Sequence, residues 1–217
     1  MQTLVPTPAG DARITLFEAA GRPRARLALG HGAGGGIEAA DLQALAAALP
    51  PLGFTVALVE QPWRVAGKKL APPPRTLDAL WLPVLPELAA DGVPLYVGGR
   101  SAGARVACRT GLASGAAGVL ALAFPLHPPG RPEKSRAQEL LDTGLPTLVV
   151  QGGADTFGGP AEFPALPAGH RLVEVPEAGH GFKVPKRAAL GRPEVLALIT
   201  DAVGGWLTEL TGPGGRP

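Results

Sequence analysis

Residues 94–105 read Pro-Leu-Tyr-Val-Gly-Gly-Arg-Ser-Ala-Gly-Ala-Arg and place one serine, Ser101, between two glycines. Before the serine, residues 95–97 are strand formers bounded by proline and glycine, and after it the alanine-rich pattern favours a buried helix. The stretch therefore predicts a strand, a tight turn that carries Ser101, and a helix. Such a turn needs very small residues two positions to either side of the serine, and Gly99 and Gly103 meet that need.

The predicted turn also favours a chemical role for the serine. It exposes the hydroxyl of Ser101 at the edge of a sheet and above the first turn of a helix, where free N–H groups favour developing negative charge. This geometry suits attack on a carbonyl carbon. The alternative is a serine that only caps a helix in a glycine-rich turn, and the rest of the chain must decide between the two.

Length and composition predict a single α/β domain over residues 1–217. The chain is 46% hydrophobic, which is enough to build a sizeable core in a domain of this size. Glycine and proline are abundant, at 31 and 25 residues, yet the apolar residues cluster into regular runs. We therefore expect a folded chain and not a low-complexity one.

Charge and cysteine content narrow the function classes. The net charge is +2 and the basic residues are scattered, so the basic stripe of a nucleic-acid-binding protein is missing. The one cysteine, Cys108, is expected to be a small buried residue. Neither a leader-like start nor an apolar run of about 18 residues is visible, so we expect a cytoplasmic protein that does not bind a membrane.

Strand and helix patterns alternate along the chain. Strands are predicted at residues 13–19, 25–30, 54–60, 94–97, 119–124, 147–150 and 171–175. Helices are predicted at residues 41–49, 76–89, 133–141 and 193–210, besides the one after Ser101. The first two strands look like an antiparallel edge hairpin. The alternation predicts a mainly parallel, doubly wound sheet of about seven strands, with helices on both faces.

Catalytic groups in such a sheet gather at the carboxyl ends of the strands. Ser101, Asp155 and His180 all follow predicted strands, in that order along the chain, whereas His170 precedes a strand and is expected at the surface. Hydroxyl attack on a carbonyl needs a base to take the proton and an acid to orient that base. The sequence therefore predicts Ser101 as nucleophile, His180 as base and Asp155 as its carboxylate partner.

This order, the serine turn and the loop His-Gly-Ala-Gly at residues 31–34 resemble the α/β-hydrolase superfamily over almost the whole chain. Within it the chain is similar to the small, lidless, dienelactone-hydrolase-like branch. Residues 124–134, which read Phe-Pro-Leu-His-Pro-Pro-Gly-Arg-Pro-Glu-Lys, resemble a segment of the group that includes testis-expressed and chromatin-complex hydrolase-like proteins. The resemblance implies the same roles for Ser101, Asp155 and His180, with His180 as general base and then general acid.

An oxyanion hole is expected beside the serine. One donor would be the backbone N–H of Ala102 and the second that of Ala33 or Gly34, in a loop whose glycines allow close approach. A donor of this kind is worth roughly 3 to 4 kcal/mol in the transition state. A dinucleotide-binding loop is the alternative, but no acidic residue follows a later strand in a suitable context, so no cofactor is expected. The spacing of Cys and His predicts no metal site.

Five further residues are candidates for the substrate pocket: His31, Trp63, Arg100, His127 and Phe157. His31 is more readily a brace for the glycine loop than a base. His127 either contacts substrate or is a buried histidine bonded to the backbone, and Trp63 either lines the pocket or packs in the core. Arg100, next to the serine, either attracts an anionic substrate or pairs with a neighbouring acid.

Together these features predict a serine hydrolase that cleaves an ester, thioester or lactone of a small soluble acyl substrate through an acyl-enzyme on Ser101. In the superfamily that the chain resembles, a lid usually follows the strand before the acid-bearing one. Here only residues 127–146 are available for it, so the resemblance implies an open and shallow pocket. Two alternatives stay open: a hydrolase-like scaffold that binds partner proteins, and an acyltransferase or perhydrolase.

Overall fold

The computed structural model describes residues 1–90 and 92–212. Its centre is an eight-stranded sheet with the strand order β1-β2-β4-β3-β5-β6-β7-β8. The strands are β1 (Gln2–Thr7), β2 (Gly10–Phe17), β3 (Ala25–Gly30), β4 (Phe54–Glu60), β5 (Leu95–Arg100), β6 (Gly118–Leu122), β7 (Thr147–Gly152) and β8 (His170–Val175). The α-helices are α1 (Ala40–Ala48), α2 (Pro62–Val65), α3 (Pro74–Trp81), α4 (Ala102–Thr110), α5 (Ala137–Leu141) and α6 (Arg192–Thr211).

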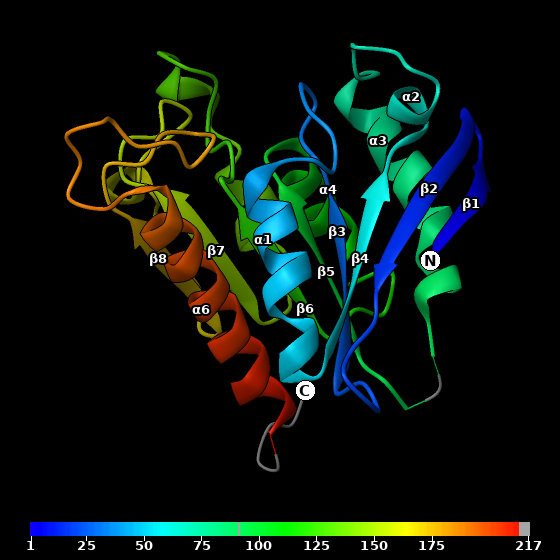
Figure 1. Cartoon of the computed structure of the whole chain (residues 1–217). Coiled ribbons are helices and arrows are strands. Elements are labelled where there is room, and N and C mark those ends of the chain that lie inside the picture. The colour runs from blue at the N-terminus through cyan, green and yellow to red at the C-terminus, as the bar shows by residue number, and fades with distance from the viewer. Residues whose placement is uncertain (91, 213–217) are drawn as a thin grey trace.

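The predicted doubly wound architecture is confirmed. Strands β3 to β8 pair in parallel, while β1 and β2 are antiparallel to their neighbours. Figure 1 shows α1 and α6 on the near face of the sheet and α4 behind it. Leu45 and Ile199 of the two near helices belong to one buried cluster, and Trp81 and Val106 of α3 and α4 belong to the other. Burial on both faces explains why β4 is apolar at five of its seven positions.

The edge of the sheet differs from the prediction. Residues 2–7 form an eighth strand, β1, which makes the antiparallel hairpin with β2. Strand β2 then pairs with β4 and not with β3, so the predicted hairpin of residues 13–30 is wrong. The reason is that β3 lies between β4 and β5 and has no free edge for β2. The single fully buried side chain of β1 is Val5, so this strand lacks the alternation that marks a half-buried strand.

Proline shortens two of the predicted helices. The helix predicted over residues 76–89 ends at Trp81 and continues as two 3-10 turns, Leu82–Val84 and Pro86–Leu88, because prolines within it cannot donate a helical N–H. The helix predicted over residues 133–141 is likewise a 3-10 turn, Pro132–Lys134, followed by the short α5. No helix in the described part of the chain is long and apolar enough to cross a membrane.

Candidate active site

The turn between β5 and α4 holds Ser101 in a strained backbone conformation. Its φ of 53° and ψ of −113° are unusual for a residue with a side chain, as expected where the local structure is under functional constraint. The neighbouring glycines are needed for packing. A Cβ on Gly103 would lie 2.5 Å from the carbonyl oxygen of Gly30, and a Cβ on Gly99 would lie 2.9 Å from the carbonyl carbon of Gly103. Helix α4 can therefore approach β3 only because side chains are missing here.

The structure brings together Ser101, His180 and Asp155 above the carboxyl ends of the strands. The Nε2 atom of His180 lies 2.8 Å from Ser101 Oγ, and its Nδ1 atom lies 2.9 Å from Asp155 Oδ2. The carboxylate of Asp155 is fully buried, while the imidazole is 21% exposed. A carboxylate can only accept, so Nδ1 carries the proton and Nε2 is left to accept the hydrogen bond of the serine hydroxyl.

Two further groups orient the carboxylate of Asp155. The buried side-chain amide of Gln151 donates to Asp155 Oδ2 at 3.0 Å and to the carbonyl of Gly158 at 2.7 Å. The backbone N–H of Phe157 donates to Asp155 Oδ1 at 2.8 Å. Sequence analysis missed Gln151, although a polar residue near the end of the otherwise apolar strand β7 was a visible signal.

The glycine loop, residues 31–34, is held in place by hydrogen bonds of the His31 ring. Its Nε2 accepts the backbone N–H of Gln61 at 3.0 Å, so Nδ1 carries the proton and donates to the carbonyl of Gly32 at 2.8 Å. Burial lowers the pKa of His31, although the hydrogen bond to Gly32 partly offsets this effect, and the ring is therefore neutral. Trp63 packs against the ring edge to face, with centroids 5.2 Å apart. The bracing interpretation of His31 agrees with this geometry.

A cavity of about 460 Å³ opens beside the serine. Ala33 and Gly34 of the glycine loop line it together with Ser101 and Ala102, which places the expected oxyanion donors around one space. The other wall comes from a segment that was not expected near the site, residues 69–74, and from Leu77 of α3. The loop between α2 and α3 had no pattern that pointed to a pocket, and only the sheet topology brings it here.

Of the five candidate pocket residues, only Phe157 lines this cavity in the described part of the chain. Its ring lies on the His180 imidazole with centroids 4.2 Å apart. His31, Trp63, Arg100 and His127 are not among the residues that line this cavity, and their contact with substrate stays a prediction. His127 is buried and bonds the carbonyl of Pro128 and the carboxylate of Glu162, as its backbone-bonded alternative predicted.

Arg100 also has a partner. Its Nε donates to Asp41 Oδ2 at 3.0 Å, and its Nη2 donates to the backbone carbonyl of His180 at 2.8 Å. The guanidinium therefore ties the strand before the nucleophile to α1 and to the histidine loop. His170, which was expected at the surface, is partly exposed, and its Nε2 lies 2.9 Å from Thr143 Oγ1.

Arginines dominate the charged wall of the cavity. Arg105 and Arg109 follow Ser101 at helical spacing of four and eight residues, so sequence periodicity could have found them. Both are paired, Arg105 with Glu139 and Arg109 with Glu139 and Asp78.

Arg136 is different, because the one hydrogen bond of its side chain among the described residues goes to the carbonyl of Pro125 at 3.1 Å. Burial and the charge of Arg105 lower the pKa of Arg136, which a bound anion would reverse.

Among residues 1–90 and 92–212, no group of three or more His, Cys, Asp or Glu side chains could hold a metal ion.

Comparison with known proteins places this geometry in context. Residues 23–208 match the family described as "Alpha/beta hydrolase domain". A serine hydrolase homologue from Coxiella burnetii superposes with a TM-score of 0.75 at 18% identity, covering 94% of this chain and 96% of that one. A serine hydrolase without lid from Xanthomonas campestris gives 0.70 at 20% identity, covering 95% and 94%. Dienelactone hydrolase from Anabaena variabilis gives 0.72 at 17% identity, covering 96% of each. No curated protein matches the chain in sequence.

Proposed function

The chain belongs to the family of alpha/beta hydrolase domains, as its sequence motifs predicted, and from this premise we propose that it is a serine hydrolase. The bond it cleaves is a carboxylic ester, thioester or lactone, and the reaction passes through an acyl-enzyme on Ser101. The observation that carries the proposal is the continuous hydrogen-bond chain from Ser101 Oγ through His180 to Asp155. The narrower resemblance to testis-expressed and chromatin-complex proteins stays a prediction.

The proposed mechanism follows the protons of the imidazole. His180 Nε2 takes the proton of Ser101 Oγ while the oxygen attacks the carbonyl carbon of the substrate. Asp155 holds the other proton on Nδ1 and stabilises the imidazolium that forms. The imidazolium then protonates the leaving alcohol or thiol, which departs and leaves the acyl group on the serine. In the second half His180 deprotonates a water molecule, which attacks the acyl group; the bond to Ser101 Oγ then breaks, His180 returns the proton to that oxygen, and the acid is released.

The negative charge that forms on the carbonyl oxygen needs donors. In the proposal these are the backbone N–H of Ala102, at the start of α4, and that of Ala33 or Gly34. Their common position around the cavity supports this assignment. The dipole of α4 also favours negative charge at this point.

The cavity supports a small substrate. Its volume of about 460 Å³ lies within the range of small-molecule pockets, and residues 127–146 form only a 3-10 turn and α5, with no large lid. The free N–H groups of Arg136 suit an acidic group on the substrate, because Arg105 and Arg109 already have carboxylate partners. We infer that the preferred ester carries a carboxylate or similar anion.

A fluorophosphonate probe tests the central claim, since it reacts with an activated serine. We expect labelling of the wild-type protein, none in Ser101→Ala, and a sharp fall in His180→Ala. Ser135→Ala is the matched control, because Ser135 is exposed and its Oγ accepts the backbone N–H of Ala137 and has no histidine partner, so its loss should leave labelling unchanged. A folded wild-type protein that takes no label would contradict the proposal and favour the scaffold alternative. Competition between water and added alcohols for the acyl-enzyme then separates hydrolysis from acyl transfer.

A further inference from the structure

A second and larger cavity, of about 790 Å³, is lined by Arg100, the residue before the serine. Its walls are the start of α1, residues 181–186, 188, 190 and 191 after the catalytic histidine, and the first turns of α6. As far as the described residues form these walls, Ser101 and His180 are not part of them. The mechanism proposed above does not use this space.

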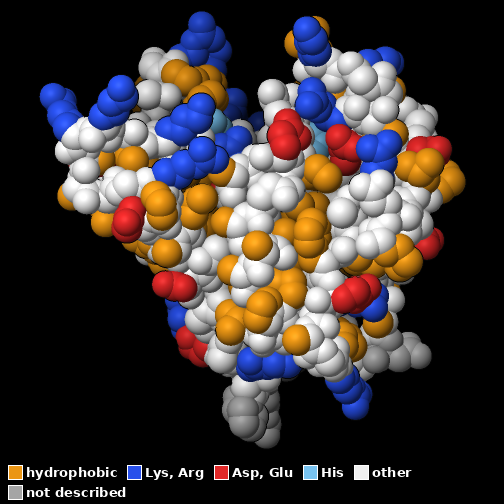
Figure 2. Space-filling model, viewed as in Figure 1, with side chains coloured by type: hydrophobic (Ala, Val, Ile, Leu, Met, Phe, Trp, Pro, Cys, Tyr) orange, Lys and Arg blue, Asp and Glu red, His pale blue; other side chains and the backbone are white. Residues whose placement is uncertain are grey.

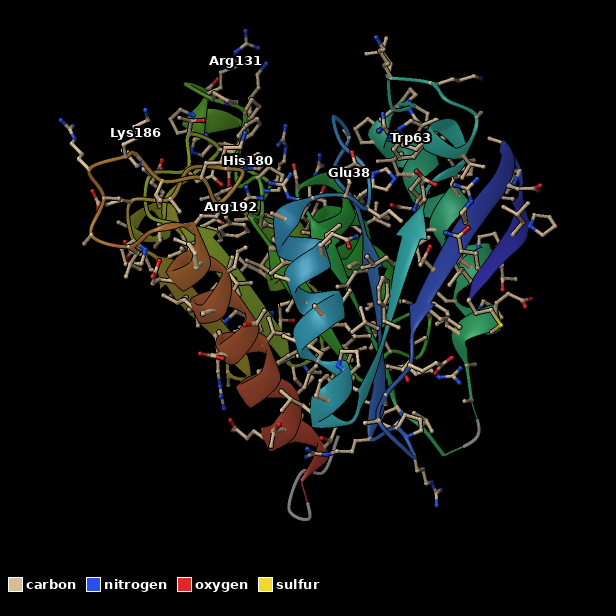
Figure 3. All side chains as sticks on the ribbon, viewed as in Figure 1. Glu38, Trp63, Arg131, His180, Lys186 and Arg192 are labelled. Carbon is tan, nitrogen blue, oxygen red and sulfur yellow. The ribbon has the colours of Figure 1, made fainter. Side chains whose placement is uncertain are left out.

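The charged residues of the second cavity are nearly all cations. Arg100, Lys183, Lys186 and Arg192 line it, and the one lining carboxylate, Asp41, is buried and bonded to Arg100. Within residues 1–90 and 92–212, no carboxylate lies within 4.0 Å of the two lysines or of Arg192. Figure 2 shows Lys and Arg side chains gathered over the top of α6 and its neighbouring loop, and Figure 3 places Lys186 and Arg192 on the His180 side of the molecule.

Two carboxylates nearby do not cancel this charge. Glu194 lies close over the start of α6, since a Cβ on Gly191 would come 2.7 Å from its Oε2. Glu177 accepts the backbone N–H of Ala189 at 3.0 Å. Neither residue lines the cavity, and Glu177 is bonded to backbone at its margin.

The remaining walls are apolar. Phe182, which is 4% exposed, forms part of the wall, together with Val184, Leu190 and Leu196. The floor is held in place by Arg100, which bonds both Asp41 and the carbonyl of His180. A cavity with exposed cations and partly apolar walls suits a ligand that is negatively charged at one end.

We propose that this second cavity binds a small organic anion carrying an apolar chain, at a site separate from Ser101. The anionic group lies against Lys186 and Arg192, and the chain lies against the apolar wall. Phosphate and carboxylate share the chemistry that these cations recognise. The proposal does not depend on catalysis by Ser101.

Calorimetric titration of Ser101→Ala protein with octyl phosphate tests the site without any contribution from turnover. We expect saturable binding of one molecule and no binding of octyltrimethylammonium. Affinity should rise from ethyl to octyl phosphate, by up to roughly fourfold for each methylene that becomes buried. Octanoate in place of octyl phosphate distinguishes a carboxylate-binding from a phosphate-binding site.

Charge-reversal variants locate the binding. The double variant K186E/R192E should bind octyl phosphate at least about tenfold more weakly, because two attractions become repulsions. R187E is the matched control, since Arg187 is exposed in the same segment but lies outside the cavity. Circular dichroism checks that each variant is folded.

Three results would overturn the proposal. One is the absence of saturable binding, and another is equal weakening by R187E, which would indicate only general surface attraction. The third is weakening by Arg136→Met without weakening by K186E/R192E, which would assign the anion to the first cavity. Failure of fluorophosphonate labelling would instead contradict the proposed hydrolase and leave this result unaffected.

Discussion

Replacement of Gly103 by alanine tests whether the close approach of α4 to β3 builds the site. The added Cβ would lie 2.5 Å from the carbonyl oxygen of Gly30, 2.7 Å from its carbon and 3.0 Å from the carbonyl oxygen of His31. All three are backbone atoms, so no side-chain rotation can relieve the contact. Either α4 or the segment that leads into the glycine loop must move.

The expected effect on stability is the balance of two terms. Alanine gains at most about 0.5 to 1 kcal/mol over glycine in a helix. Overpacking against a fixed backbone costs about 1 to 3 kcal/mol. Gly103→Ala should therefore lower the free energy of unfolding by up to about 2 kcal/mol. Gly205→Ala is the matched control, because Gly205 is exposed in α6 with nothing within 4 Å of its Cβ position, and it should stabilise the protein.

The effect on activity should be larger than the effect on stability. Movement of Gly30 and His31 displaces Ala33 and Gly34, which carry the proposed oxyanion donor, and a misplacement of about 1 Å can lower the rate about 100-fold. We expect kcat/KM for p-nitrophenyl acetate to fall by about that factor in Gly103→Ala and to stay unchanged in Gly205→Ala. Urea unfolding and steady-state kinetics measure both quantities.

A Gly103→Ala protein that keeps kcat/KM within threefold of wild type and unfolds at the same urea concentration as wild type would refute this prediction. Such a result would mean that α4 can shift without disturbing the glycine loop. If Gly205→Ala destabilised the protein as much as Gly103→Ala, the expected gain of alanine over glycine in a helix would be contradicted. Either outcome can be read without a structure of the variant.

Three more predictions concern the polar groups around the site. Gln151→Leu removes a donor from buried Asp155 and should lower the free energy of unfolding by about 1 to 3 kcal/mol, visible as a lower urea midpoint; an unchanged midpoint would contradict the orienting role. Burial raises the pKa of Glu139, but hydrogen bonds and charge from Arg105 and Arg109 outweigh this and hold the pKa below its ordinary value. The stability that this lowered pKa confers is present above the unfolded-state pKa of about 4.3 and is lost as pH falls through the lower folded-state pKa. The difference in free energy of unfolding between wild type and Glu139→Gln should therefore be about 1 kcal/mol at pH 7 for this partly exposed network. It should shrink below about pH 4. Arg136→Met should raise KM for p-nitrophenyl hemisuccinate about 10-fold or more and leave KM for p-nitrophenyl butyrate unchanged. Equal changes in KM for both esters would exclude recognition of the anion by Arg136.

Local pattern was enough to predict the central parallel strands and the serine turn. A buried parallel strand reads as a short apolar run, and the glycines around Ser101 answer a steric need that lies within a few residues of it. The order of Ser101, Asp155 and His180 after successive strands was equally visible. Parallel strands end at one edge of a sheet, and so these residues were expected to meet.

The edge strands and the surroundings of the site could not be predicted in the same way. Strand β1 is largely exposed, so its sequence shows little alternation of apolar and polar residues. The partner of β2 depends on which strand of the sheet has a free edge. The wall formed by residues 69–74 comes from a loop without periodicity, which reaches the serine only because α3 packs behind the sheet.

What the sequence determined by itself was the alternation of elements, the strained turn at Ser101 and the identity of the three residues that face one another. What only the tertiary structure decided was the partner of each charge. Arg100 lies next to the serine in the chain, yet its guanidinium bonds Asp41 and the carbonyl of His180 and borders a different cavity. Short-range sterics leave their mark on neighbouring residues, whereas an arginine has a long side chain whose partner is set by whichever distant segment the fold brings within reach.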